Sequence, residues 1–172
     1  MNTPRLGLRA LCVDDAPAVF AYARDPEVAR FTLWEPHASE EATRSFLTGL
    51  TGPFAMAWAI IPDESRAFAG MVFLHSLNAH HRKAELAFNL GRQSWNQGIA
   101  TEAAAAVLGF AFGKLGLNRV EATCMPGNAG SRRVLEKLGM SQEGTMRSSH
   151  WRHDGFHDMV LFSVLRGERP SA

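Results

Sequence analysis

Four short runs within the first ninety positions of the chain are apolar or alternate loosely between hydrophobic and polar residues. Such alternation is typical of strands, because successive side chains of a strand point to opposite faces. We therefore expect strands at 6–11, 54–61, 67–74 and 84–90. In the last of these, Leu86, Phe88 and Leu90 share one face. Glu85 and Asn89 lie on the other face.

The clearest helical pattern lies in the second half of the chain. Hydrophobic residues recur there at helical spacing, at Ala104, Val107, Leu108, Ala111 and Leu115. We expect this helix to end near Gly116, because glycine suits a helix C-terminus. Further helices are expected after Asp15, at 39–50 and before Gly139, and further strands at 120–124, 144–151 and 159–165.

The order of these elements predicts the fold class. Strands follow one another early and then alternate with helices, which is typical of an α+β or mixed α/β domain whose central sheet is covered on both faces. A chain of 172 residues suits one domain, and neither a linker nor a repeat interrupts it. We therefore expect a single domain over residues 1–172.

Composition excludes several classes of function. Hydrophobic residues make up 46% of the chain and charged residues 20%, with a formal net charge of +1. This balance offers no general attraction to nucleic acids or membranes. No apolar segment approaches the roughly 20 residues that span a bilayer. The N-terminus also lacks the pattern of a signal peptide, so we expect a cytoplasmic protein.

A polar turn between the strand at 84–90 and the longest helix carries the most specific chemistry. Gly98 has no Cβ, and Ala100 is small, so a ligand could approach the main chain closely. The unpaired N–H groups and the dipole of a helix N-terminus both favour an anion. This turn predicts a phosphate site. The alternative is that Gly98 only begins a packed helix.

The residues around this turn resemble the GNAT superfamily of acetyl-CoA-dependent N-acetyltransferases. The family's turn has the pattern Gln/Arg-x-x-Gly-x-Gly/Ala, and residues 95–100 match it except at the first position, which is Trp95. Residues 84–90, 128–140 and 154–158 resemble the neighbouring blocks of the family. The closest resemblance is to the branch that includes ribosomal-protein alanine N-acetyltransferases.

This resemblance implies a mostly antiparallel sheet in which two parallel strands, 84–90 and 120–125, splay apart around acetyl-CoA. The pantetheine arm would pair with the main chain of Phe88, Asn89 and Leu90. The diphosphate would bind the N–H groups of Gln97, Gly98, Ile99, Ala100 and Thr101. Asn128 would reach the pantetheine or the thioester, and Arg133 could meet the adenosine 3′-phosphate. The alternative for Arg133 is a solvated helix face.

Two residues are candidates for proton transfer. Glu85 is the candidate base that deprotonates the amine through an intervening water. Its alternative role is an exposed carboxylate paired with Arg or Lys. Ser131 lies where the family often has Tyr or Ser, and it is the candidate proton donor to the departing thiolate. Asn128 and Ser131 could instead simply cap a helix.

The acceptor side of the site is less specific. In the family, the region between the first two helices helps to form the acceptor site, so Trp34 could supply an apolar wall and Glu35 an anion for a cationic amine. Simple packing is the alternative for Trp34. The histidines at 150, 153 and 157 do not share one face of a strand, so we expect no metal site.

The resemblance implies acetyl transfer from acetyl-CoA to a primary amine, either a protein N-terminal α-amine or a small-molecule amine. A non-catalytic acyl-CoA-binding sensor or interaction module of the same fold is the alternative. A nucleotide-binding protein of unrelated fold is a third reading. An exposed strand edge near the C-terminus would allow a homodimer.

Overall fold

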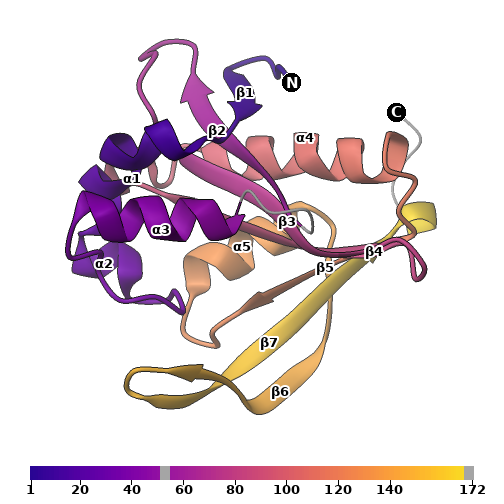
Figure 1. The fold of residues 1–172 in the computed structure, drawn as a ribbon. Coiled ribbons are helices and arrows are strands. Elements are labelled where there is room, and N and C mark those ends of the chain that lie inside the picture. Colours follow the sequence, from indigo (N-terminus) through magenta and orange to yellow (C-terminus); the bar gives the residue numbers. More distant parts are fainter. Residues whose placement is uncertain (51–54, 169–172) are drawn as a thin grey trace.

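The computed structural model describes residues 1–50 and 55–168 and contains one seven-stranded sheet (Figure 1). The strand order is β1-β2-β3-β4-β5-β7-β6, and each neighbouring pair is antiparallel except the parallel pair β4 and β5. The strands are β1 (Leu6–Ala10), β2 (Met56–Pro62), β3 (Gly70–Asn78), β4 (Lys83–Leu90), β5 (Arg119–Cys124), β6 (Ser141–Arg152) and β7 (Gly155–Leu165).

Helices cover both faces of the sheet, as expected (Figure 1). One face carries α4 (Ile99–Gly113) and α5 (Ala129–Lys137), and the other carries α1 (Ala16–Ala23), α2 (Pro26–Ala29) and α3 (Glu40–Leu50). The small side chains on the inner stripe of α4, such as Ala103 and Ala104, let this helix lie close to the sheet. Val107 and Leu108 on the same stripe are fully buried and extend the core.

The second face is only partly covered by helices. The hydrophobic cluster under α1 and α3 draws its buried strand residues from β2 and β3, at Ala59 and Met71. The same face continues over β4 and β5 with polar side chains, including Glu85, Asn89 and Glu121. The sheet therefore presents a polar region beside the helical layer, and this region lies over the junction of β4 and β5.

Most of the expected elements are confirmed, with small shifts at their ends. The helix expected at 39–50 is α3, and the helix expected to end near Gly116 is α4. The strand expected at 54–61 is β2, although residue 54 lies outside the described residues. The two C-terminal strands are longer than expected, and the short helix α2 was not expected. No helix in the described ranges has the length and hydrophobicity to span a membrane.

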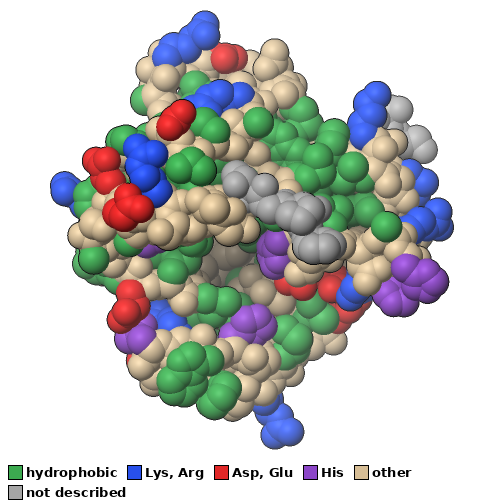
Figure 2. All heavy atoms as spheres, in the orientation of Figure 1, with side chains coloured by type: hydrophobic (Ala, Val, Ile, Leu, Met, Phe, Trp, Pro, Cys, Tyr) green, Lys and Arg blue, Asp and Glu red, His purple; other side chains and the backbone are tan. Residues whose placement is uncertain are grey.

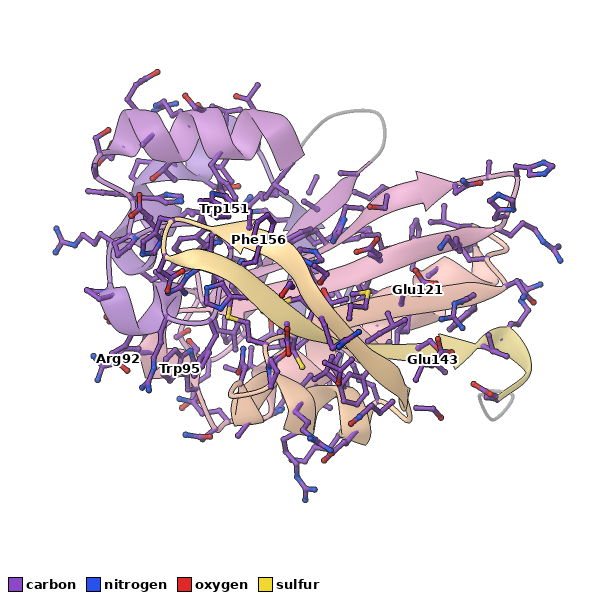
Figure 3. All side chains as sticks on the ribbon, turned by 90° about the horizontal axis from the view of Figure 1, so that it is seen from below. Arg92, Trp95, Glu121, Glu143, Trp151 and Phe156 are labelled. Atoms are coloured by element: carbon purple, nitrogen blue, oxygen red, sulfur yellow. The ribbon has the colours of Figure 1, made fainter. Side chains whose placement is uncertain are left out.

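A network of charged side chains fastens β4, β5, β6 and β7 together. The guanidinium of Arg119 contacts both carboxyl oxygens of Glu143 at 2.5 and 2.7 Å and Glu121 at 2.7 Å. Lys83 contacts Glu121 at 3.2 Å, and the hydroxyl of Ser163 donates to Glu143 at 2.6 Å. Figure 3 shows Glu121 and Glu143 at the end of the sheet away from Trp95. The network therefore braces the end at which β4 and β5 are paired.

This network predicts an acid-sensitive contribution to stability. Hydrogen bonds from Arg119 and Ser163 lower the pKa of Glu143 to about 2. A carboxyl whose pKa is lower in the folded state stabilises the protein above its unfolded pKa of about 4.3, and the contribution is lost as the pH falls toward 2. We expect Glu143→Gln to reduce the loss of stability between pH 5 and pH 2, measured by urea unfolding, with an effect at pH 7 of about 1 kcal/mol or less because the pair is partly exposed.

Glu64 provides a matched control, because it is an exposed carboxylate in the turn after β2. Glu64→Gln should leave the acid dependence close to that of the unaltered protein. Equal acid dependence in Glu143→Gln and the unaltered protein would contradict this role of the network.

Candidate functional site

The parallel strands β4 and β5 pair over only three positions. Lys83 pairs with Arg119, Ala84 with Val120 and Glu85 with Glu121, and no further pair follows. Both strands nevertheless continue, since β4 pairs with β3 as far as residue 90 and β5 pairs with β7 as far as residue 124. The strands therefore separate after their first three pairs. We call this opening the β4–β5 splay, formed by residues 86–90 of β4 and 122–124 of β5.

The phase of the hydrogen bonds decides which main-chain groups face the splay. Gly91 donates its N–H to Ala69 at 3.0 Å, so the antiparallel ladder directs the main-chain groups of every second residue of β4 toward β3. By this alternation, Asn89 faces β3, whereas Phe88 and Leu90 face the splay. An extended ligand can therefore pair with Phe88 and Leu90 in the manner of an added strand.

This phase changes the expected role of Asn89. Its main chain is directed to β3, and its side-chain Oδ1 accepts a hydrogen bond of 2.6 Å from the hydroxyl of Tyr22. Burial raises the pKa of Tyr22 well above its usual range, so this hydroxyl stays protonated and can donate. Asn89 is thus anchored between β3 and α1, and the prediction that its main chain pairs with pantetheine does not fit the ladder.

The side chain of Trp95 contacts the C-terminal end of β4. Its indole N–H donates to the carbonyl oxygen of Leu90 at 2.9 Å, while the ring is partly exposed. The residue that departs from the family pattern therefore satisfies a main-chain acceptor at the mouth of the splay. The main-chain N–H and C=O of Phe88 and the N–H of Leu90 remain directed into the splay.

The turn at residues 95–98, which we call the Gly98 turn, leads directly into α4. Gly98 is the N-cap, with φ of 77° in the left-handed region that favours glycine, and no side chain caps the helix. The first helical bond runs from Glu102 N–H to Gly98 C=O at 3.0 Å. The N–H groups that precede it lack helical acceptors, at Gly98, Ile99, Ala100 and Thr101. The predicted anion site thus has its donors in place.

The N-terminus of α5 lies at the same end of the splay, because β4 and β5 are parallel and each leads into a helix at its C-terminal end. Asn128 is the N-cap of α5, and its Oδ1 accepts the main-chain N–H of Ser131 at 3.0 Å. The capping role is therefore observed for Asn128, whereas Ser131 contributes only its main-chain N–H. The Ser131 hydroxyl takes no part in this bond. Arg133 is exposed and lies 3.7 Å from Glu136.

Glu85 lies at the closed end of the splay, opposite Glu121 in register. The carboxylate of Glu121 is paired with Lys83 and Arg119. Glu85 is half-buried, and Nε2 of the His75 imidazole lies 3.9 Å from its carboxylate. Among the residues that the structure describes, Glu85 forms no ion pair with an Arg or a Lys. His75 was not singled out from the sequence.

The acceptor residues predicted from the sequence lie between α2 and α3. Trp34 packs against His37 and Phe46, with ring centroids 4.9 and 6.1 Å apart, so its packing role is observed. Glu35 is exposed and its carboxylate lies 3.6 Å from Nδ1 of His153 in the turn between β6 and β7. Glu35 therefore contributes to a contact between two chain segments that are remote in sequence.

A second contact joins the same segments. Arg152 donates to the carbonyl of Arg30 at 2.7 Å, which ties the β6–β7 hairpin to the end of α2. Trp151 and Phe156 on this hairpin are 63% and 65% exposed and pack edge to face (Figure 3). Figure 2 shows the surface hollowed between α3 and the hairpin.

Comparison with known proteins fits this geometry. A family model described as the acetyltransferase (GNAT) domain matches residues 5–141. The uncharacterised N-acetyltransferase p20 of Bacillus licheniformis is 30% identical over 98% of this chain and 97% of its own length. YdaF of Bacillus subtilis, named as a candidate ribosomal N-acetyltransferase, is 34% identical over 63% of this chain and 68% of its own.

A solved structure agrees with these relatives. The GNAT-family acetyltransferase of Bacillus anthracis superposes with a TM-score of 0.87 at 28% identity, and the match covers 97% of this chain and 98% of that one. The matched family model spans β1 to the start of β6 and includes the splay, the Gly98 turn and the N-terminus of α5. The chain therefore belongs to the GNAT family of acetyl-CoA-dependent N-acetyltransferases.

Proposed function

We propose that this N-acetyltransferase binds acetyl-CoA in the β4–β5 splay and transfers the acetyl group to a primary amine. The observation that carries the proposal is the run of unpaired main-chain groups along one path. These groups begin at Phe88 and Leu90 and continue to the N–H groups of residues 98–101. The first pair suits the amides of pantetheine, and the second set suits a diphosphate.

The proposed reaction follows from what direct transfer requires. The amine nitrogen attacks the thioester carbonyl carbon, and Glu85 accepts the proton that the nitrogen loses, through an intervening water. A main-chain N–H of Phe88 or Leu90 stabilises the negative charge that builds on the carbonyl oxygen. The C–S bond then breaks, and the thiolate takes a proton through the hydroxyl of Ser131, which regains one from water as Glu85 releases its proton to the solvent. The products are an amide and free CoA.

The acceptor we favour is the α-amine of a protein. The similarity to YdaF supports this choice, because that relative is named for a ribosomal acceptor. An α-amine has a pKa near 8, so a fraction of it is already unprotonated at neutral pH. A weak base such as Glu85 needs to deprotonate only the rest. Glu35 and the hairpin residues would then contact the acceptor chain near its amine.

A thiol-release assay tests this function. The protein and acetyl-CoA are mixed in separate reactions with short peptides that carry free α-amines, with polyamines or with aminoglycosides. We expect free thiol to appear faster with at least one peptide than in the absence of an acceptor. Binding of CoA by calorimetry without release across the panel would instead identify a non-catalytic acyl-CoA module. Release with polyamines alone would contradict the protein acceptor.

A further inference from the structure

The N-terminal segment lies directly against the Gly98 turn, although more than ninety residues separate the two in sequence. The hydroxyl of Thr3 donates to Glu102 at 2.6 Å, and the main-chain N–H of Arg5 donates to the same carboxylate at 3.0 Å. The guanidinium of Arg5 reaches the other carboxyl oxygen at 2.7 Å through both Nε and Nη2. Glu102 in the first turns of α4 is thus held by the segment that precedes β1.

The same guanidinium also contacts the turn itself. Its Nη1 donates to the carbonyl of Gln97 at 3.2 Å, and its Nη2 would lie 3.4 Å from a Cβ placed on Gly98. Gln97 is held further by its own side chain, which donates to Gln93 C=O at 2.6 Å. One planar group therefore bridges a carboxylate and a main-chain carbonyl, a geometry that the single ammonium of lysine does not reproduce.

The position of Glu102 creates an electrostatic problem for the proposed ligand. Burial acts to raise the pKa of Glu102, but the hydrogen bonds from Thr3 and Arg5 outweigh it and lower that pKa. Glu102 is therefore an anion at neutral pH. An anion beside a helix N-terminus is favourable by itself, yet it repels a second anion that binds to the same first turn. Arg5 offsets this charge and holds the carboxylate away from the free N–H groups.

We propose that Arg5 is a positioning residue for coenzyme binding, which neutralises Glu102 and fixes the Gly98 turn so that the N–H groups of residues 98–101 remain available to a diphosphate. This inference rests on the proposed function. Arg5 contacts Glu102 and the Gly98 turn, whereas the proposed pantetheine path runs along Phe88 and Leu90, so we expect its effect on the part of the coenzyme that carries the diphosphate. Its loss should therefore alter coenzyme affinity rather than the chemical step.

Two acetyl donors, one with the diphosphate and one without it, distinguish this role from a general structural one. With acetyl-CoA, Arg5→Gln should raise KM about tenfold and leave kcat within about twofold, since tenfold corresponds to the strength of one partly buried charge contact. With S-acetylpantetheine, which lacks the diphosphate, KM should not change. Arg5→Lys restores the charge without the bridging geometry and should give an intermediate KM with acetyl-CoA.

Arg9 in β1 offers a matched control close to Arg5 in sequence. It forms a similar ion pair with Asp15, at 2.5 and 2.8 Å, and among the described residues its hydrogen bonds go to Ala10 and Asp15 and not to the Gly98 turn. Arg9→Gln should leave both KM values close to those of the unaltered protein. A change in KM for S-acetylpantetheine in Arg5→Gln, or the same change in Arg9→Gln, would overturn the proposal.

A double-mutant cycle identifies how Arg5 acts. If Arg5 works by neutralising Glu102, the effect of Arg5→Gln on KM for acetyl-CoA should fall to about twofold or less in a Glu102→Gln background. An undiminished effect there would mean that Arg5 acts without Glu102 and would overturn the proposed neutralisation. Calorimetry with CoA separates the two levels of inference. Absent binding in the unaltered protein refutes the proposed function, whereas equal binding in Arg5→Gln refutes only this inference.

Discussion

Glu85→Gln is expected to lower kcat about 100-fold or more, because loss of a general base typically costs that factor. The amide keeps the size and the strand position of the carboxylate but cannot accept the proton of the attacking amine. Glu85 lies at the closed end of the β4–β5 splay, away from the Gly98 turn, so KM for acetyl-CoA should stay close to its original value. Thiol release at saturating concentrations of both substrates measures the change.

The pH profile adds a second readout for the same variant. A higher pH supplies more unprotonated amine, so the activity of Glu85→Gln should recover partly as the pH approaches the pKa of the free amine. Glu64→Gln serves as the control, since Glu64 is an exposed carboxylate in the turn between β2 and β3. Full activity of Glu85→Gln at neutral pH would exclude Glu85 as the base.

Gly98→Val is expected to weaken CoA binding at least about tenfold, because the left-handed region costs a residue with a side chain about 1–2 kcal/mol and a β-branched residue more. The φ angle of Gly98 is 77°. The chain can relieve the strain only by rotating the peptide groups that present the free N–H donors. The dissociation constant of CoA, measured by calorimetry, reports the loss directly.

A substitution at Gly116 serves as the control that distinguishes loss of the CoA site from the general effect of backbone strain. It has φ of 65°, with no atom within 4 Å of a Cβ placed on it, and it follows the C-terminus of α4. Gly116→Val should lower the melting temperature by an amount similar to Gly98→Val and leave the CoA dissociation constant unchanged. Equal loss of CoA binding in both variants would show that the effect comes from general destabilisation.

Local sequence patterns predicted the elements that carry one hydrophobic side. The alternation at 84–90 and the helical stripe that includes Ala104 and Leu108 both identify segments whose buried face is regular. The β6–β7 hairpin was underestimated because most of β6 is exposed, so no inward face marks its start at residue 141. The helix α2 was missed because its four residues are too few to show a period.

In the candidate site, too, features that are local in sequence were predicted, and contacts between distant residues were not. The Gly98 turn was predicted because glycine, the small Ala100 and the helix start are neighbours in sequence. The contact of Tyr22 with Asn89 joins residues 67 positions apart, and that of Arg5 with Glu102 joins residues 97 positions apart. No local pattern indicates such pairs, because they arise only when α1 and β1 pack against the sheet and α4. Nothing in the sequence around Tyr22 therefore indicates that its hydroxyl reaches β4.

A crystal structure of the protein with bound CoA tests the central claim most directly. The account predicts a diphosphate within hydrogen-bond distance of the N–H groups of residues 98–101 and a pantetheine arm paired with the main chain of Phe88 and Leu90. The thiol should then point toward the polar face that carries Glu85. A β4–β5 splay that stays empty at saturating CoA, or a diphosphate bound elsewhere, would contradict the account.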